Sequence, residues 1–140
     1  MNPVLLVLPL LLATVLPGFA QKVDYRTFDV VARSGNVAVV VKDNDYRMVV
    51  GSLIKPKTVF LLGYSKEQAA LKIKRLIKIC ENENYIKKNR RVTFCTVVLH
   101  LSSKEKGGKE WYTIVREDDG AKFVIVKEAL QSVKGVLENH

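Results

Sequence analysis

Alternation of apolar and polar side chains predicts antiparallel strands in the first half of the chain. Ser34 and Gly35 separate the first two runs and are typical of a tight hairpin turn. The run from Val37 to Val41 is apolar at every position, so we expect a strand that is buried on both faces. Pro56 cannot donate to a central ladder and ends the third run. The four predicted strands span residues 26–32, 36–42, 46–53 and 58–62.

Helical spacing of apolar residues replaces the strand pattern from Ser65 to about Glu81. Ser65 followed three residues later by Gln68 is a capping-box pattern, which predicts where this helix begins. Its apolar face carries Ala69, Ile73, Leu76, Ile77 and Cys80. A second helix is predicted at the end of the chain, from Lys127 to Leu137.

The segment between the two helices predicts three more strands. Residues 91–102 form the longest one, and a polar loop with Gly107 and Gly108 follows it. Residues 110–116 and 122–126 then form a hairpin around Asp119 and Gly120, a strong turn signal.

The predicted fold class is α+β, in the order ββββα–βββα. We expect an antiparallel β-sheet of about seven strands, packed against one long amphipathic helix and a C-terminal helix. The order also fits two units that each consist of a hairpin followed by a helix. Tyr46–Val50 resembles Tyr112–Arg116, and the helix start at Lys66 resembles the helix start at Lys127. Apolar strands resemble one another through composition alone, so duplication and chance both remain open.

The first twenty residues, Met1–Ala20, hold no charged side chain and are mostly Leu and Val. Gly18 and Ala20 suit a cleavage site before Gln21, so residues 1–20 are predicted to be a signal peptide and residues 21–140 a single secreted domain. The alternative is an uncleaved membrane anchor, which needs roughly 20 apolar residues without the interruptions that prolines bring here. No later segment is long and apolar enough to predict a transmembrane helix.

Fourteen residues lie between the two cysteines, Cys80 and Cys95. In the oxidising secretory route such a pair is expected to form a disulfide, which would stabilise the fold by roughly 3 kcal/mol. A zinc site needs four nitrogen or sulfur ligands, and a redox catalyst needs Cys-x-x-Cys spacing, so neither is predicted.

The formal net charge of +9 belongs entirely to the chain after the leader. A basic exported protein meets acidic or sulfated glycans, bacterial surface lipid and acidic matrix, whereas export places nucleic acid low among its partners. The alternative is that the charge serves only solubility. The candidate anion-binding residues are Lys87, Lys88, Arg90 and Arg91 between the cysteines, and Lys72, Lys74, Arg75 and Lys78 on the first helix. A disulfide would join the two groups into one surface.

Catalytic patterns are weak. His100 is the one internal histidine, and it is expected at the edge of the core. The chain has no Gly-x-Ser-x-Gly elbow, no phosphate-binding loop and no dinucleotide fingerprint. Asp43 and Asp45 suit a turn better than a metal site. We therefore predict a protein that is not an enzyme, with no cofactor and no metal.

Two family resemblances are visible in the order of elements. Residues 58–126 resemble the cystatin-like arrangement, but residues 102–108 stand where cystatin inhibitors carry Gln-x-Val-x-Gly, so the resemblance does not imply inhibition. Two sheet-then-helix units are similar to the PUR and Whirly single-stranded nucleic-acid binders, which are intracellular. Neither resemblance covers the chain with a specific motif.

Three hypotheses for function follow. The first is a secreted binding protein that docks on an anionic polymer or surface, with an affinity that falls as salt rises. The second is a secreted protein-binding module, such as a cystatin-like inhibitor or an effector, that uses the loops at 104–109 and 43–45. The third is a structural component of the extracellular matrix.

Overall fold

A computed structural model describes residues 23–82 and 91–139. This part of the chain is α+β, with two four-stranded antiparallel sheets and two α-helices. The first half contains β1 (Asp29–Ser34), β2 (Val37–Lys42), β3 (Asp45–Gly51), β4 (Pro56–Gly63) and α2 (Lys66–Glu81). The second half contains β5 (Arg91–Phe94), β6 (Val97–Lys106), β7 (Lys109–Arg116), β8 (Lys122–Val126) and α4 (Lys127–Glu138).

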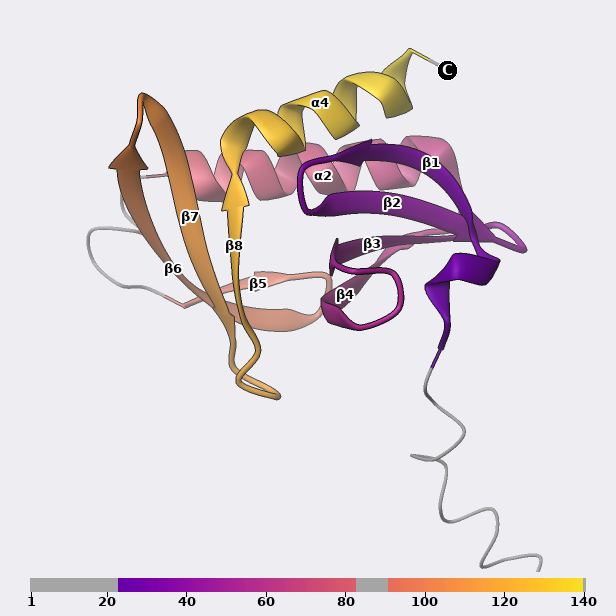
Figure 1. Cartoon of the computed structure of the whole chain (residues 1–140), viewed down its shortest axis with the longest axis horizontal. Helices are drawn as coiled ribbons and strands as arrows, with labels where there is room; N and C mark the ends of the chain where they lie inside the picture. Colours follow the sequence, from indigo (N-terminus) through magenta and orange to yellow (C-terminus); the bar gives the residue numbers. More distant parts are fainter. Residues whose placement is uncertain (1–22, 83–90, 140) are drawn as a thin grey trace, which may run out of the picture.

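The strands of each sheet follow one another in chain order, so each sheet is a simple meander. The two helices lie side by side across the sheets, with β1–β4 under one end and β5–β8 under the other (Figure 1). Helix α4 follows the second sheet but packs against β1 and β2 of the first. The two halves therefore depend on each other for burial.

One apolar core joins both sheets to both helices. Phe60 of the first sheet meets Phe94 and Phe123 of the second, with ring centroids 5.3 and 5.9 Å apart. The inner faces of α2 and α4 contribute Ile73 and Leu130, which are fully buried. Edge-on aromatic contacts of this kind add to the stabilisation that buried apolar area provides.

The prediction that the second strand is buried on both faces is confirmed. Val37 and Val39 of β2 belong to the main core, whereas Ala38 and Val40 face the opposite way. That outer face is covered by Tyr25, from the short 3-10 helix η2 (Tyr25–Thr27).

The predicted cap of the first helix is also confirmed. Ser65 is the N-cap of α2, and its hydroxyl accepts a hydrogen bond from the Gln68 backbone N–H at 3.1 Å. The Gln68 side chain reaches back and accepts from the Tyr64 N–H at 2.7 Å, one residue earlier than in a standard capping box. Gly63 has φ +145°, and a Cβ there would lie 2.6 Å from Gln68 Oε1, so this position requires glycine.

The strand count differs from the prediction of about seven strands in one sheet. The described residues form eight strands in two sheets, because the predicted strand 91–102 is two strands. A two-residue turn at Cys95 (φ 50°) and Thr96 (φ 66°) reverses the chain between β5 and β6. The predicted loop at 104–109 is itself mostly strand, because β6 and β7 continue to a Gly107–Gly108 turn.

Arg116, at the end of β7, joins the second sheet to the first through hydrogen bonds to β4. Its Nη1 donates to Thr58 Oγ1 at 2.8 Å and to the Val59 carbonyl at 2.9 Å. The guanidinium also lies 5.0 Å from the centroid of the Phe60 ring and pairs with Asp118 at 2.8 Å. Only 13% of the Arg116 side chain is exposed, so these contacts are shielded from water.

Candidate functional site

The four cations predicted on the first helix lie outside its buried face, with Lys74, Arg75 and Lys78 exposed and Lys72 half-buried at the flank. We call Lys72, Lys74, Arg75 and Lys78 the α2 cations. They do not form one stripe, because residues two apart on a helix point about 160° away from each other. Lys72 and Arg75 face the tip of the β5–β6 hairpin, and Lys74 and Lys78 face α4.

None of the α2 cations lies within ion-pairing distance of a carboxylate in residues 23–82 and 91–139. The polar contact that the structure does show is from Arg75 Nη2 to the Thr93 carbonyl, at 3.3 Å. An ammonium or guanidinium without a carboxylate neighbour keeps its full charge for a ligand from solution. This face of α2 is therefore an available positive surface.

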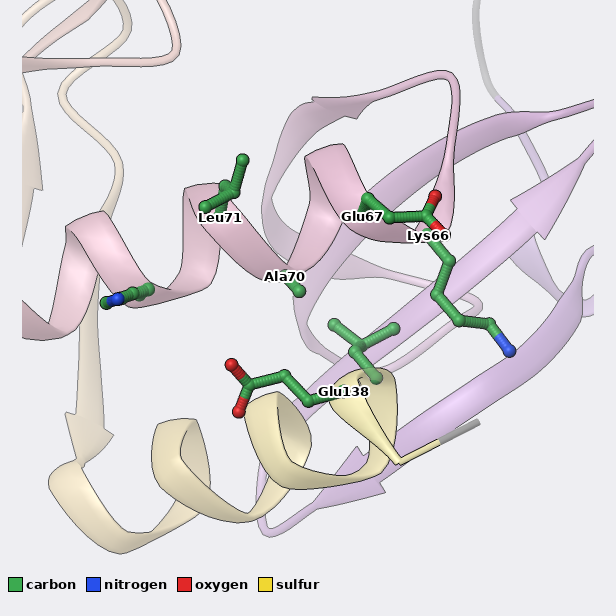
Figure 2. Close-up of a pocket in the computed structure, with 7 residues that line it drawn as sticks. Lys66, Glu67, Ala70, Leu71 and Glu138 are labelled. Carbon is green, nitrogen blue, oxygen red and sulfur yellow. The ribbon is translucent and has the colours of Figure 1, made fainter.

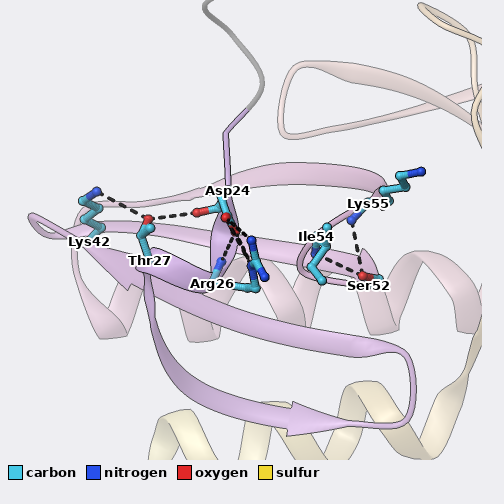
Figure 3. Close-up of polar contacts among 7 residues, drawn as sticks. All are labelled: Asp24, Arg26, Thr27, Lys42, Ser52, Ile54 and Lys55. Atoms are coloured by element: carbon cyan, nitrogen blue, oxygen red, sulfur yellow. Dashed lines mark hydrogen bonds and ion pairs between the residues drawn. The ribbon is translucent and has the colours of Figure 1, made fainter.

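Two other cations of the first half, Arg26 and Lys42, bond to neighbouring side chains, as Figure 3 shows. Arg26 forms a bidentate pair with Asp24, with Nη2 to Oδ2 at 2.7 Å, and these hydrogen bonds hold the pKa of Asp24 at about 2. Lys42 Nζ donates to the Thr27 hydroxyl at 3.5 Å. These side chains anchor the segment before β1, so they differ in role from the α2 cations.

The side of α2 that faces α4 has a depression of about 500 Å³ with mixed charge. Glu67 and Glu138 line it together with Lys66 and Lys74, while Leu71 stands on its rim and points away from α4 (Figure 2). Because two carboxylates and two ammonium groups share this depression, its charge selects neither anions nor cations.

The opposite side of α2 has a cleft of about 650 Å³, which we call the cationic cleft. Lys72 and Arg75 are its charged residues, and no Asp or Glu is among the side chains that line it. Its walls come from the end of β4, the start of α2 and the tip of the β5–β6 hairpin. The lining residues are Leu61, Leu62, Gly63, Tyr64, Gln68, Leu71, Lys72, Arg75, Cys95 and Thr96.

Arg91, the fourth residue of the predicted basic loop, is engaged within the fold. Its Nη2 and Nε lie 2.6 and 2.7 Å from the two carboxylate oxygens of Glu117. The same carboxylate is 2.9 Å from His100 Nε2, and together these hydrogen bonds hold the pKa of Glu117 below its usual range. The Arg91 side chain remains 61% exposed in this pair, so its role as an anion ligand stays a prediction.

The other three loop residues, Lys87, Lys88 and Arg90, lie outside the described residues, as does the predicted signal peptide 1–20. The anion-binding role of these loop residues and the signal peptide therefore stay predictions.

The predicted disulfide is not formed, and both cysteines are free thiols. Cys95 lies in the cationic cleft beside Lys72 and Arg75, whereas Cys80 is near the end of α2, close to Glu110.

Burial governs the chemistry of both thiols. It raises the pKa of Cys80 to about 12 and also raises the pKa of Cys95 above its usual value. Thiols with raised pKa values are poor nucleophiles at neutral pH. His100, half-buried on β6, has no hydroxyl or thiol among its described contacts. In the described residues, no group of three or more His, Cys, Asp or Glu side chains could hold a metal ion.

Three exposed apolar residues of the cationic cleft, Leu61, Tyr64 and Leu71, were not predicted from the sequence. Leu71 was visible as an apolar residue on the polar side of an amphipathic helix. Tyr64 directly precedes the N-cap, where a side chain often remains outside the core. Only the fold brings Leu61 of β4 next to them.

Comparison with known protein families, with curated proteins and with solved structures finds no match to this chain. Within residues 23–82 and 91–139, no helix combines the length and the apolar character needed to span a membrane.

Proposed function

We propose that this chain is an exported, non-enzymatic binding protein that docks on anionic extracellular polymers or surfaces. The observation that carries the proposal is the set of α2 cations, which have no carboxylate partner among the described residues and stand on the solvent side of a well-capped helix. The charge-free leader supports export, and the net charge of +9 supports an anionic partner.

The helix is a suitable platform because its position is fixed independently of the ligand. Its N-cap is bonded by Ser65, its inner face is buried, and Arg75 ties it to β5. Cations held on a rigid element lose less conformational entropy on binding than cations on a loop. The predicted loop residues Lys87, Lys88 and Arg90, which follow α2 in the sequence, remain candidates for the same kind of contact.

The test is binding to heparin, measured by titration calorimetry on wild type and two variants with equal charge. The α2 charge variant replaces Lys72, Lys74, Arg75 and Lys78 with Gln. The matched control replaces four exposed lysines of the second sheet, Lys104, Lys106, Lys109 and Lys122, with Gln. A third variant replaces Lys87, Lys88 and Arg90 with Gln.

We expect the α2 charge variant to lose at least tenfold in affinity and the matched control to lose much less. Equal losses in the two variants would mean that net charge alone attracts the polymer, and the proposed site would be wrong. A loss confined to the loop variant would place the contact between residues 87 and 90 instead. A wild type that binds neither heparin nor anionic vesicles at low salt would contradict the proposed function itself.

A further inference from the structure

The cationic cleft gathers an unusual share of the exposed apolar surface of the described chain. Leu61, Tyr64 and Leu71 are 44%, 64% and 64% exposed, and they are three of the seven large apolar residues that remain exposed. All three line this one cleft. Contiguous exposed apolar residues mark interaction sites more often than isolated ones do.

Within the cleft these apolar residues adjoin cations and no carboxylate, whereas the far side of Leu71 borders the depression that holds Glu67 and Glu138. Lys72 lies one residue after Leu71, and Arg75 lies one helical turn further on. A sulfated glycan would use such cations but offers little apolar surface to Leu61 and Leu71. The interface of an anionic bilayer offers both, since negative headgroups lie directly above acyl chains.

We propose that the cationic cleft docks on anionic phospholipid bilayers, with lipid headgroups on Lys72 and Arg75 and with Leu71 and Tyr64 entering the interfacial layer. The proposal rests on the proposed function and names the surface that it recognises. Tyrosine suits this depth because its ring is apolar and its hydroxyl is polar. Leu61 supports the other two from the end of β4.

The position of Leu71 fits insertion rather than enclosure of a ligand. It lines both the cationic cleft and the depression beside α4, so it forms the ridge between them. Figure 2 shows its side chain directed away from α4. A ridge can reach a flat membrane surface, whereas a residue at the bottom of a cavity cannot.

The support beneath Tyr64 and Leu71 is rigid. The Tyr64 N–H is bonded to the Gln68 side chain at 2.7 Å, and Leu71 is held in the second turn of α2. The pair Lys74 and Lys78 on the other side of the ridge adds to the positive field above a negative membrane.

The experiment is co-sedimentation with vesicles, in parallel with heparin binding. It uses the form that begins at Gln21, because the apolar leader would itself bind lipid and every described element lies after it. The vesicles are phosphatidylcholine alone, or equal parts phosphatidylcholine and phosphatidylglycerol. The test variant is Tyr64→Ser with Leu71→Ser, and the matched control is Ile54→Ser with Val124→Ser, two exposed apolar residues outside the cleft.

We expect wild type to bind the mixed vesicles and to bind phosphatidylcholine weakly. The test variant should bind mixed vesicles about tenfold more weakly, with heparin affinity unchanged, while the control variant behaves as wild type. In addition, Tyr64→Trp should give a blue shift of emission with mixed vesicles that wild type, with Trp111 alone, does not show.

Two results would overturn the lipid assignment and leave the proposed function standing. One is a test variant that binds mixed vesicles as well as wild type does. The other is a wild type that binds heparin but not vesicles. Loss of both heparin and vesicle binding in wild type would contradict the proposed function as well. A wild type that self-associates while the test variant stays monomeric, with vesicle binding equal in both, would assign the cleft to a second copy of the chain.

Discussion

The contact between the two sheets should depend strongly on Arg116. In Arg116→Met the apolar stem remains, but the charge and the donors to Thr58 and to the Val59 carbonyl are lost. A hydrogen bond from a charged group contributes about 1.5–3 kcal/mol, and a buried acceptor left without its donor costs about 1–3 kcal/mol. Because Asp118 is half exposed, the bonds to Thr58 and Val59 set the expected loss, about 3 kcal/mol.

The assay is urea unfolding followed by far-ultraviolet circular dichroism. Arg116→Met should lower the free energy of unfolding by about 3 kcal/mol, which corresponds to roughly 10 °C in Tm for a domain of this size. Arg33→Met is the matched control, because Arg33 is exposed on β1 and has no ion pair among the described residues, so its effect should stay within about 0.5 kcal/mol. Equal effects of the two changes would refute the argument that Arg116 joins the sheets.

Three further predictions concern the turn before α2, the thiols and the carboxylate beside β5. Gly63→Ala should destabilise by more than about 1 kcal/mol in urea unfolding, because its φ and its contact with the capping glutamine both exclude a Cβ; Gly120→Ala, with open space, should cost less. In the folded protein at pH 8, Cys80 should resist a thiol reagent, and after unfolding without reductant both thiols should react with it. No reaction after unfolding would instead show a disulfide. Arg91→Gln should raise the pKa of Glu117 toward its usual value, as measured by NMR titration, and an unchanged pKa would contradict the pairing. A carboxylate with a depressed pKa stabilises the fold above its unfolded pKa, and this stabilisation is lost as the pH falls through its folded pKa. The free energy of unfolding of the variant should therefore fall less steeply as the pH is lowered.

Much of the fold follows from patterns that act locally. Ser65 and Gln68 predict where α2 begins. The uninterrupted apolar run of β2 predicts that this strand is buried on both faces. Such signals depend on one element and its immediate neighbours. They identify helices and most strands without reference to the rest of the chain.

No local pattern predicts that residues 91–102 form two strands rather than one. The turn is formed by Cys95 and Thr96, whereas hairpin turns of this kind favour Asn-Gly or Asp-Gly. Threonine is β-branched and rarely adopts positive φ, so the sequence carries no turn signal there. Tertiary packing of β5 against α2, with Arg75 bonded to the Thr93 carbonyl, accompanies the reversal.

The candidate site was predictable only as a set of charges. Helical spacing places the α2 cations on the solvent side, but it does not show which of them has a carboxylate neighbour. Arg91 was predicted as an anion ligand, and the sequence did not show that the fold would also pair it with Glu117. The cationic cleft depends on three segments that meet only in the folded chain, which is why its apolar residues were missed.

The salt dependence of polyanion binding tests the account most directly. Single-stranded DNA serves as a probe of known charge, and the slope of log K against log salt changes by about 0.7 for each phosphate contact. If all four α2 cations make contact, their replacement by Gln should reduce the slope by about three, while the matched lysine control of the second sheet keeps the slope of wild type. An unchanged slope in the α2 charge variant, or an equal reduction in the control, would contradict the claim that this chain docks on anionic surfaces through α2.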